Sequence, residues 1–156
     1  MATTGFPMTS ASSKTLPSSV FELVFRLSRV AEDRLGAAYA PFGLSLGDVE
    51  VLAALRCSGA PYTLAPRQLC AAVKMTTGGM TGRLDRLERA GLLRRSPDPH
   101  DRRALRVTMT DEGMRVIDEA LEAGLATQAG MLSALNAEES PQLAELLQVL
   151  VTAMDA

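Results

Sequence analysis

The chain has 156 residues, of which 47% are hydrophobic, and carries two cysteines, one histidine and a net charge of −2. A chain of this size can bury an adequate apolar core without disulfides or a structural metal, and Cys57 and Cys70 lack the spacing of metal ligands. No run of about 18 uncharged apolar residues is present, so neither secretion nor a membrane span is expected, and a reduced, cytoplasmic setting fits best.

The N-terminal part divides into a tail and a helix. Residues 1–17 are rich in Ser, Thr, Pro and Ala and are expected to form a flexible tail ahead of a single domain over 18–156. From Ser18 to about Tyr39, apolar residues recur at spacings of three and four, which predicts a long helix. Phe21 and Phe25 widen its apolar face, which favours burial against a second subunit.

Helix-start signals mark three further helices. Ser45, with Asp48 three residues later, is typical of a helix N-cap, and Thr76 has the same role before a helix at 77–89. Pro66 suits the first turn of a short helix between them. The helix at 77–89 is expected to bury Met80, Leu84 and Leu87, which recur at helical spacing. It is expected to end at Gly91.

The remaining third predicts a hairpin and two helices. Alternating residues at 92–95 and 104–109 flank a polar stretch with two prolines, which predicts a two-stranded hairpin with a long charged loop. Thr110 is expected to begin the next helix. The final helix, 138–154, carries one continuous apolar stripe that must be covered.

Charge is distributed unevenly along the chain. Between residues 66 and 109 there are ten basic and four acidic side chains, a net charge of +6, whereas the rest of the chain carries a net charge of −8. This asymmetry is expected where one segment faces phosphate groups, although a solvated helix face would also account for it.

The order of elements predicts a mainly α fold with a small β-hairpin wing. A winged helix-turn-helix lobe at about 45–109 is flanked by dimerisation helices at 18–40 and 110–156. Such a lobe places the helix at 77–89 and the hairpin tip against duplex DNA. The candidate DNA contacts are Thr76, Thr77, Gly79, Met80, Thr81, Arg83, Arg86, Arg102 and Arg103.

These candidates have different expected roles. Arg83 is expected to project outward and read a base, whereas Arg86 either contacts phosphate or pairs with Asp85 and Glu88. In the hairpin loop, Asp101 is expected to pair with Arg103 and stiffen the wing while Arg102 or Arg103 reaches the minor groove.

Two glycines in the first turn of this helix need an explanation. Gly78 and Gly79 each cost up to roughly 1 kcal/mol relative to Ala in a helix. A functional reason to keep them is close approach of the backbone to a groove wall, and the alternative is a frayed first turn.

The segments TGGMTGRLDRLERAGL at 77–92, PDPHDRR at 97–103 and VTMTDEG at 107–113 resemble the multiple antibiotic resistance regulator (MarR) family. The resemblance implies a homodimer whose terminal helices interlock and which binds a palindromic operator. It also implies that Arg83 and its threonine neighbours enter the major groove, and that Asp101 holds Arg103 in the minor groove.

The resemblance further implies release by a small aromatic or phenolic effector. Phe25, Arg29 and Tyr39 could line its cleft, although packing in a dimer core is the favoured explanation for them. No cofactor and no metal site is expected, and the single histidine offers no constellation for an enzyme. The remaining alternatives are a winged helix used only for protein contacts, and a thiol-responsive regulator using Cys57 or Cys70, both of which are expected to be buried.

Overall fold

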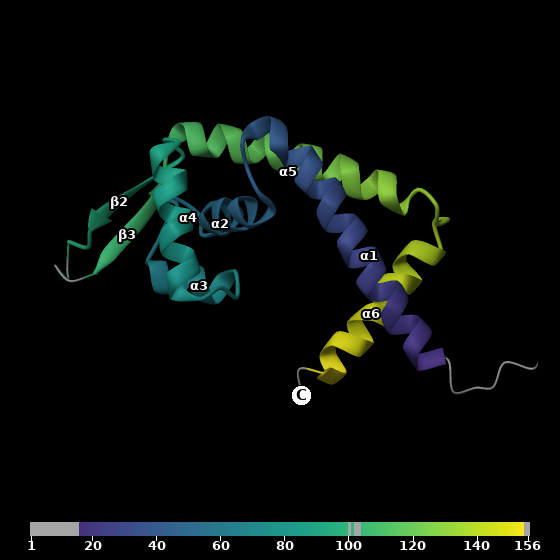
Figure 1. Cartoon of the computed structure of the whole chain (residues 1–156). Coiled ribbons are helices and arrows are strands. Elements are labelled where there is room, and N and C mark those ends of the chain that lie inside the picture. The colour runs from purple at the N-terminus through teal and green to yellow at the C-terminus, as the bar shows by residue number, and fades with distance from the viewer. Residues whose placement is uncertain (1–15, 100, 102–103, 155–156) are drawn as a thin grey trace, which may run out of the picture.

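The computed structural model describes residues 16–99, 101 and 104–154. Its helices are α1 (Leu16–Tyr39), the short 3₁₀ helix η1 (Ala40–Phe42), α2 (Leu46–Cys57), α3 (Pro66–Ala72), α4 (Thr77–Arg89), α5 (Asp111–Leu132) and α6 (Glu139–Met154). Its strands are β1 (Thr63–Leu64), β2 (Leu93–Pro97) and β3 (Leu105–Met109). Figure 1 shows a lobe built from α2, α3, α4 and the strands at one end, and α1 crossing α6 at the other. The long helix α5 extends over both parts.

The local signals that predict helix ends are confirmed. The Ser45 hydroxyl accepts the Asp48 N–H at 3.3 Å while the Asp48 carboxylate accepts the Ser45 N–H at 2.8 Å. Thr76 and Thr110 each accept the backbone N–H three residues later, at 3.4 and 3.0 Å. Gly91 follows α4 with φ +75°, a conformation that glycine adopts without a steric cost. The start of α1 differs, because Leu16 is already helical and the expected tail reached residue 17.

The sheet contains one strand more than predicted. β2 and β3 form the expected antiparallel hairpin, and β1 adds to the other side of β3 with Thr63 opposite Thr108. The two threonine hydroxyl oxygens lie 2.8 Å apart. Ser96 and Pro97, expected in the loop, extend β2 instead because both pair with β3. The hairpin is therefore anchored at its base to the segment that precedes α3.

The core lies where α2, α3, α4 and the strands meet α5. Its most buried side chains come from every one of these elements: Leu52 and Leu55, Leu69, Met80, Leu84 and Leu87, Leu93 and Val107, and Ile117. The three residues predicted to be buried on α4 are among them. This packing fixes which side of α4 faces solvent.

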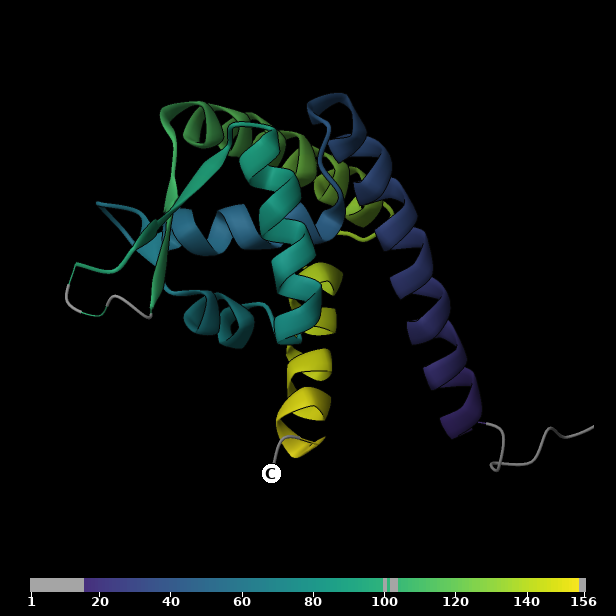
Figure 2. The ribbon, with the colours of Figure 1, turned by 60° about the vertical axis from the view of Figure 1, so that its left-hand side comes forward.

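α1 and α6 leave much of their apolar surface uncovered. The residues concerned, each between 36% and 68% exposed, are Val20, Phe21, Leu23, Phe25, Leu27 and Val30 on α1 and Leu143, Leu146, Val149, Leu150, Val151 and Met154 on α6. Four apolar residues from each helix line an open groove of about 380 Å³. Figure 2 shows both helices projecting from α5 on the same side and diverging toward the chain ends.

No single described helix is long and apolar enough to cross a membrane. Only the segments Ser19–Phe42 and Leu46–Cys57 taken together pass a test of length and composition, and they are bent by 72°.

Candidate nucleic-acid interface

The solvent side of the first two turns of α4 carries only small side chains. Its exposed residues, here called the α4 outer face, are Thr76, Thr77, Gly78, Gly79, Thr81 and Gly82. The Thr81 hydroxyl donates to the Thr77 carbonyl at 3.1 Å, and the Thr76 hydroxyl caps the helix. The unpaired N–H groups of a helix's first turn attract phosphate oxygens. Met80, predicted as a DNA contact, has no exposed surface, because the helical period that turns Thr77 outward turns Met80 into the core.

Two glycines of the α4 outer face are not required by the fold. A Cβ on Gly78 or Gly82 would meet nothing within 4 Å. Gly79 is closer to its neighbours, with its Cβ position 3.4 Å from the Thr76 hydroxyl oxygen. An alanine would fit at 78 and 82 and would favour the helix, so the glycines leave room for something that approaches the helix from outside. The sequence reasoning did not name Gly82 as a site residue, although it lies one helical turn from Gly78.

Arg83 does not project outward as expected. Its guanidinium group lies over Gly47 at the start of α2, where a Cβ on the glycine would overlap it. Its Nη1 atom is buried and has no hydrogen-bond partner among the described residues. The sequence pattern placed Arg83 on the correct side of α4 but could not show that α2 offers a space for a folded-back side chain.

Arg86 joins α4 to α2. Its Nη2 atom pairs with Asp48, whose side chain is 2% exposed, and donates to the Ser45 hydroxyl at 3.3 Å. Burial alone would raise the pKa of Asp48, but hydrogen bonds from Arg86 and Ser45 outweigh it and hold the pKa below its usual value. The expected pairing of Arg86 with Asp85 and Glu88 is wrong, because those carboxylates bind another arginine.

That other arginine is Arg95 of β2. Its Nη2 atom lies 2.6 Å from a carboxylate oxygen of Asp85 and 2.6 Å from one of Glu88. Further along the hairpin, Arg106 Nε pairs with Asp98 at 2.6 Å. Asp85, Glu88 and Asp98 therefore all form ion pairs with arginines of the wing strands.

Several basic side chains remain available. Within the described residues, four exposed basic side chains of this segment have no ion pair: Arg67, Lys74, Arg89 and Arg94. The predicted contacts Arg102 and Arg103 lie outside the described residues, so their reach into the minor groove and the pairing of Arg103 with Asp101 stay predictions. At the base of that loop, Ala104 donates its N–H to the Asp101 carbonyl and accepts the Asp98 N–H, both at 2.9 Å.

The residues predicted to line an effector cleft do not meet. Tyr39 is 4% exposed, with its ring against Gly124 of α5, whereas Phe25 is 60% exposed on the open face of α1. Arg29 is exposed too. In the described part of the chain, no cavity brings the three together, because Tyr39 belongs to the core and Phe25 to the uncovered surface of α1.

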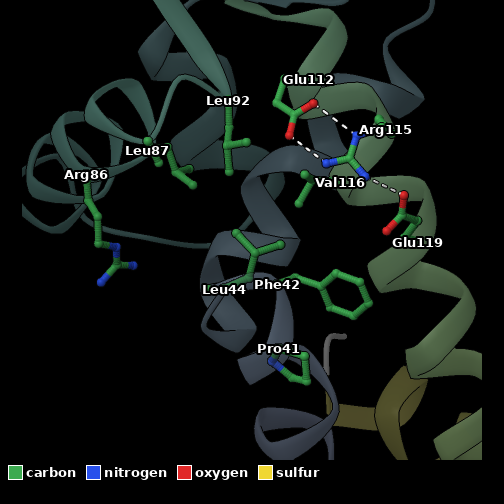
Figure 3. A pocket seen from close by; sticks show the side chains of 12 residues that line it. Pro41, Phe42, Leu44, Arg86, Leu87, Leu92, Glu112, Arg115, Val116 and Glu119 are labelled. Atoms are coloured by element: carbon green, nitrogen blue, oxygen red, sulfur yellow. Dashed lines mark hydrogen bonds and ion pairs between the residues drawn. The ribbon is translucent and has the colours of Figure 1, made fainter.

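A cavity of about 480 Å³ lies at another place, between η1, the C-terminal half of α4 and the start of α5. Figure 3 shows Phe42 and Leu44 on one side of it and Arg86 with Leu87 on the other. Arg115 lies at its α5 wall, held between Glu112 and Glu119 at 2.6 Å each. The hydrogen bonds to both glutamates raise the pKa of Arg115 and lower that of Glu112. Arg86 is thus shared by the cavity and the contact with α2.

The two cysteines differ in their surroundings. Cys57 is exposed at the end of α2, and Cys70 is half-buried against the core. The prediction that both are buried is wrong for Cys57, because α2 ends there and the packing of its inner face no longer covers the side chain. The described residues contain no group of three or more His, Cys, Asp or Glu side chains arranged to hold a metal ion.

The fold and the α4 outer face together define a class of protein. Three helices, α2 to α4, followed by a β-hairpin form a winged helix-turn-helix, a DNA-binding architecture in which the last of these helices, here α4, reads the major groove. Residues 42–104 match the model of the MarR family. The HTH-type transcriptional regulator PecS from Dickeya dadantii is 36% identical over 131 residues, which cover 84% of this chain and 79% of PecS. The chain belongs to the MarR family and is a DNA-binding transcriptional regulator.

Solved structures have the same fold. A mutant of MarR from Escherichia coli complexed with operator DNA matches with a TM-score of 0.76 and 22% identity, over 90% of this chain and 99% of that chain. A MarR family transcriptional regulator from Streptomyces coelicolor in complex with DNA matches with a TM-score of 0.80 and 19% identity, over 96% and 94%. The predicted fold class is confirmed.

Proposed function

We propose that the chain acts in the cytoplasm as a homodimeric repressor that binds a palindromic operator and is released by a small aromatic or phenolic ligand. The observation that carries this proposal is the α4 outer face, where exposed glycines and threonines cover two turns of a helix whose opposite side is anchored in the core. A surface without bulky side chains lets a duplex approach the helix backbone closely, and hydroxyl and N–H groups are suited to phosphate oxygens.

A second copy of the chain is the proposed partner of α1 and α6. Twelve apolar residues on these helices are at least 36% exposed, and a surface of this size is unfavourable in water. The same helices of another copy present an identical apolar surface, so a two-fold arrangement covers both at once. A two-fold dimer repeats α4 about one turn of DNA away, which requires an operator made of two inverted half-sites. Repression is the expected effect of such a dimer where its operator overlaps a promoter, because the bound protein blocks access of the transcription machinery.

DNA contacts are assigned to the α4 outer face and the wing. Thr76, Thr77, Gly79 and Thr81 are proposed to approach the backbone and base edges, while Arg102 and Arg103 supply the wing contact. Arg83 is proposed to read a base after it leaves its place over Gly47, since its buried Nη1 atom lacks a partner there.

The cavity beside α4 is proposed to hold the releasing ligand in place of the cleft predicted from the sequence. Phe42 and Leu44 offer an apolar wall to an aromatic ring, and Arg86 offers a cation to a phenolate or carboxylate. Arg86 also holds Asp48 of α2. A ligand that draws Arg86 away therefore loosens the contact that orients α4 on the lobe.

The proposal is tested by selecting bound sequences from a random duplex pool at about 50 mM and about 200 mM salt, together with sedimentation of the free protein. We expect a palindrome whose affinity falls steeply with salt, and a mass twice the 16.6 kDa of one chain. A matched pair of variants separates the two surfaces. Leu146→Glu on α6 should yield monomers with weak binding, whereas Thr77→Ala on α4 should leave the dimer intact and weaken DNA binding.

Each part of the proposal has an outcome that would contradict it. The palindromic dimer is contradicted if the selected DNA sequences contain no inverted repeat. It is also contradicted if sedimentation gives the mass of a single chain while the protein binds DNA with full affinity. Small phenols and benzoates are then titrated into the complex. If none releases the duplex, or if Leu44→Trp, which fills the cavity, leaves release unchanged, the ligand assignment is wrong.

A further inference from the structure

Among the described residues, Arg95 forms the ion pairs that join the wing to α4. The side chain of Arg95 in β2 is 26% exposed, and its Nε and Nη2 atoms lie 2.9 and 2.6 Å from one oxygen of Glu88. The other oxygen of Glu88 accepts the backbone N–H of Arg95 at 2.7 Å. Asp85, one helical turn before Glu88, accepts from the same Nη2 atom at 2.6 Å. Both carboxylates of α4 thus converge on one residue of the hairpin.

We propose that Arg95 is a positioning residue, which fixes the wing to α4 so that both meet DNA as one rigid surface, without contacting DNA itself. In the antiparallel sheet Arg95 lies opposite Val107 of β3, which has no exposed surface. A restraint on Arg95 is therefore transmitted to both strands of the hairpin. Because Glu88 binds the main chain of β2 as well as its side chain, it restrains the strand itself.

The neighbouring arginine provides the contrast. Successive side chains of a strand point to opposite faces, and Arg94 is exposed with no ion pair in the described part of the chain. The Nε and Nη2 donors of Arg95 are bound to carboxylates, whereas Arg94 has its donors available for phosphate. The two residues share charge and strand but differ in the expected role, which makes Arg94→Gln a matched control.

The decisive measurement is whether Glu88→Gln raises or lowers the affinity of the protein for DNA. Removing a negative charge beside a DNA-binding helix normally strengthens binding, because phosphates repel carboxylates. If Glu88 and Arg95 position the wing, Glu88→Gln instead weakens binding of a labelled random-sequence duplex of about 30 base pairs by about fivefold, the upper range for a partly exposed ion pair. Arg95→Gln weakens it by a similar factor, and the double variant loses no more than either single one. Arg94→Gln lowers the salt dependence of binding, whereas Glu88→Gln leaves it unchanged.

A second measurement on the free protein does not depend on DNA. Amide hydrogen exchange at β2 and β3 is expected to quicken in Glu88→Gln and Arg95→Gln but not in Arg94→Gln, with the exchange of α2 and α5 unchanged as a check on folding. Tighter binding by Glu88→Gln, additive losses in the double variant, or an unchanged exchange rate in the wing would each overturn the proposal. The inference needs DNA binding by the chain but neither the operator nor the ligand proposed above, so it stands or fails separately from them.

Discussion

Replacing Gly82 with alanine should stabilise the protein and weaken its binding to DNA. Gly82 lies in the interior of α4 on its exposed side, and a Cβ there would meet nothing within 4 Å. The substitution therefore introduces no clash in the free protein and gains the helix preference of alanine over glycine, about 1 kcal/mol per chain. For a chain of this length the gain corresponds to a rise in Tm of about 2–4 °C.

The effect on DNA binding has the opposite sign. If the duplex rests against the α4 outer face, the added methyl group lies in a close contact, and an extra methyl in a packed contact costs about 1–3 kcal/mol. The dissociation constant should then rise by about five- to 150-fold. Thermal unfolding and fluorescence anisotropy with a labelled duplex measure the two effects on the same sample.

Gly130→Ala provides the control for this prediction. Gly130 is also exposed within a helix, and a Cβ on it also meets nothing within 4 Å, but it lies near the end of α5 and away from α4. It should give a comparable increase in stability and leave DNA affinity unchanged. If Gly82→Ala binds DNA as tightly as the unaltered chain, or if it lowers Tm, the argument from the open space around Gly82 is refuted.

Three other predictions concern the lobe. Because the pKa of Asp48 is lowered in the folded state, the ionised carboxylate stabilises the fold at pH values above the unfolded pKa near 3.8, and this stabilisation is lost as pH falls through the folded pKa. Asp48→Asn should lower the free energy of unfolding by about 1–3 kcal/mol at neutral pH and reduce the loss of stability on acidification, as measured by urea unfolding at a series of pH values. An unchanged dependence of stability on acidic pH would contradict this prediction. A Cβ on Gly113 would overlap the backbone carbonyl before β2, so Gly113→Ala should cost at least about 1–3 kcal/mol in chemical unfolding, whereas wild-type stability would show that the backbone yields. Cys57 is exposed and Cys70 is half-buried, so Cys57 should react at once with a thiol reagent and Cys70 only slowly. Mass spectrometry after brief labelling identifies the modified residue, and faster labelling of Cys70 would contradict this prediction.

Local patterns were sufficient to predict most elements. A cap and its partner are three residues apart, so Ser45, Thr76 and Thr110 reveal helix starts without knowledge of the fold. The spacing of the apolar residues on α4 likewise determines its buried side. The pairing of β1 with β3 could not be predicted in the same way, because Thr63 pairs with a residue 45 positions later and only two residues of β1 take part.

Long side chains were the least predictable part of the site. The period of α4 places Arg83 and Arg86 on its surface, but their directions depend on what α2 offers to them. Gly47 leaves a space that Arg83 occupies, and the buried carboxylate of Asp48 attracts Arg86. The partner of Asp85 and Glu88 is a strand residue that the sequence reasoning had counted only as part of the basic charge.

The continuity of α5 has a mechanical consequence. The helix begins directly after β3 in the winged lobe and runs unbroken for 22 residues to the turn before α6, a length of about 33 Å. It also packs along α1 and α2, so a single helix contacts both the winged helix-turn-helix lobe and the exposed apolar helix α1. A tilt of about 5° where α1 and α6 meet their partner would shift the far end of this helix by about 3 Å. In the proposed dimer, α5 acts as a lever, so that the packing of α1 and α6 against the partner sets the distance between the two copies of α4.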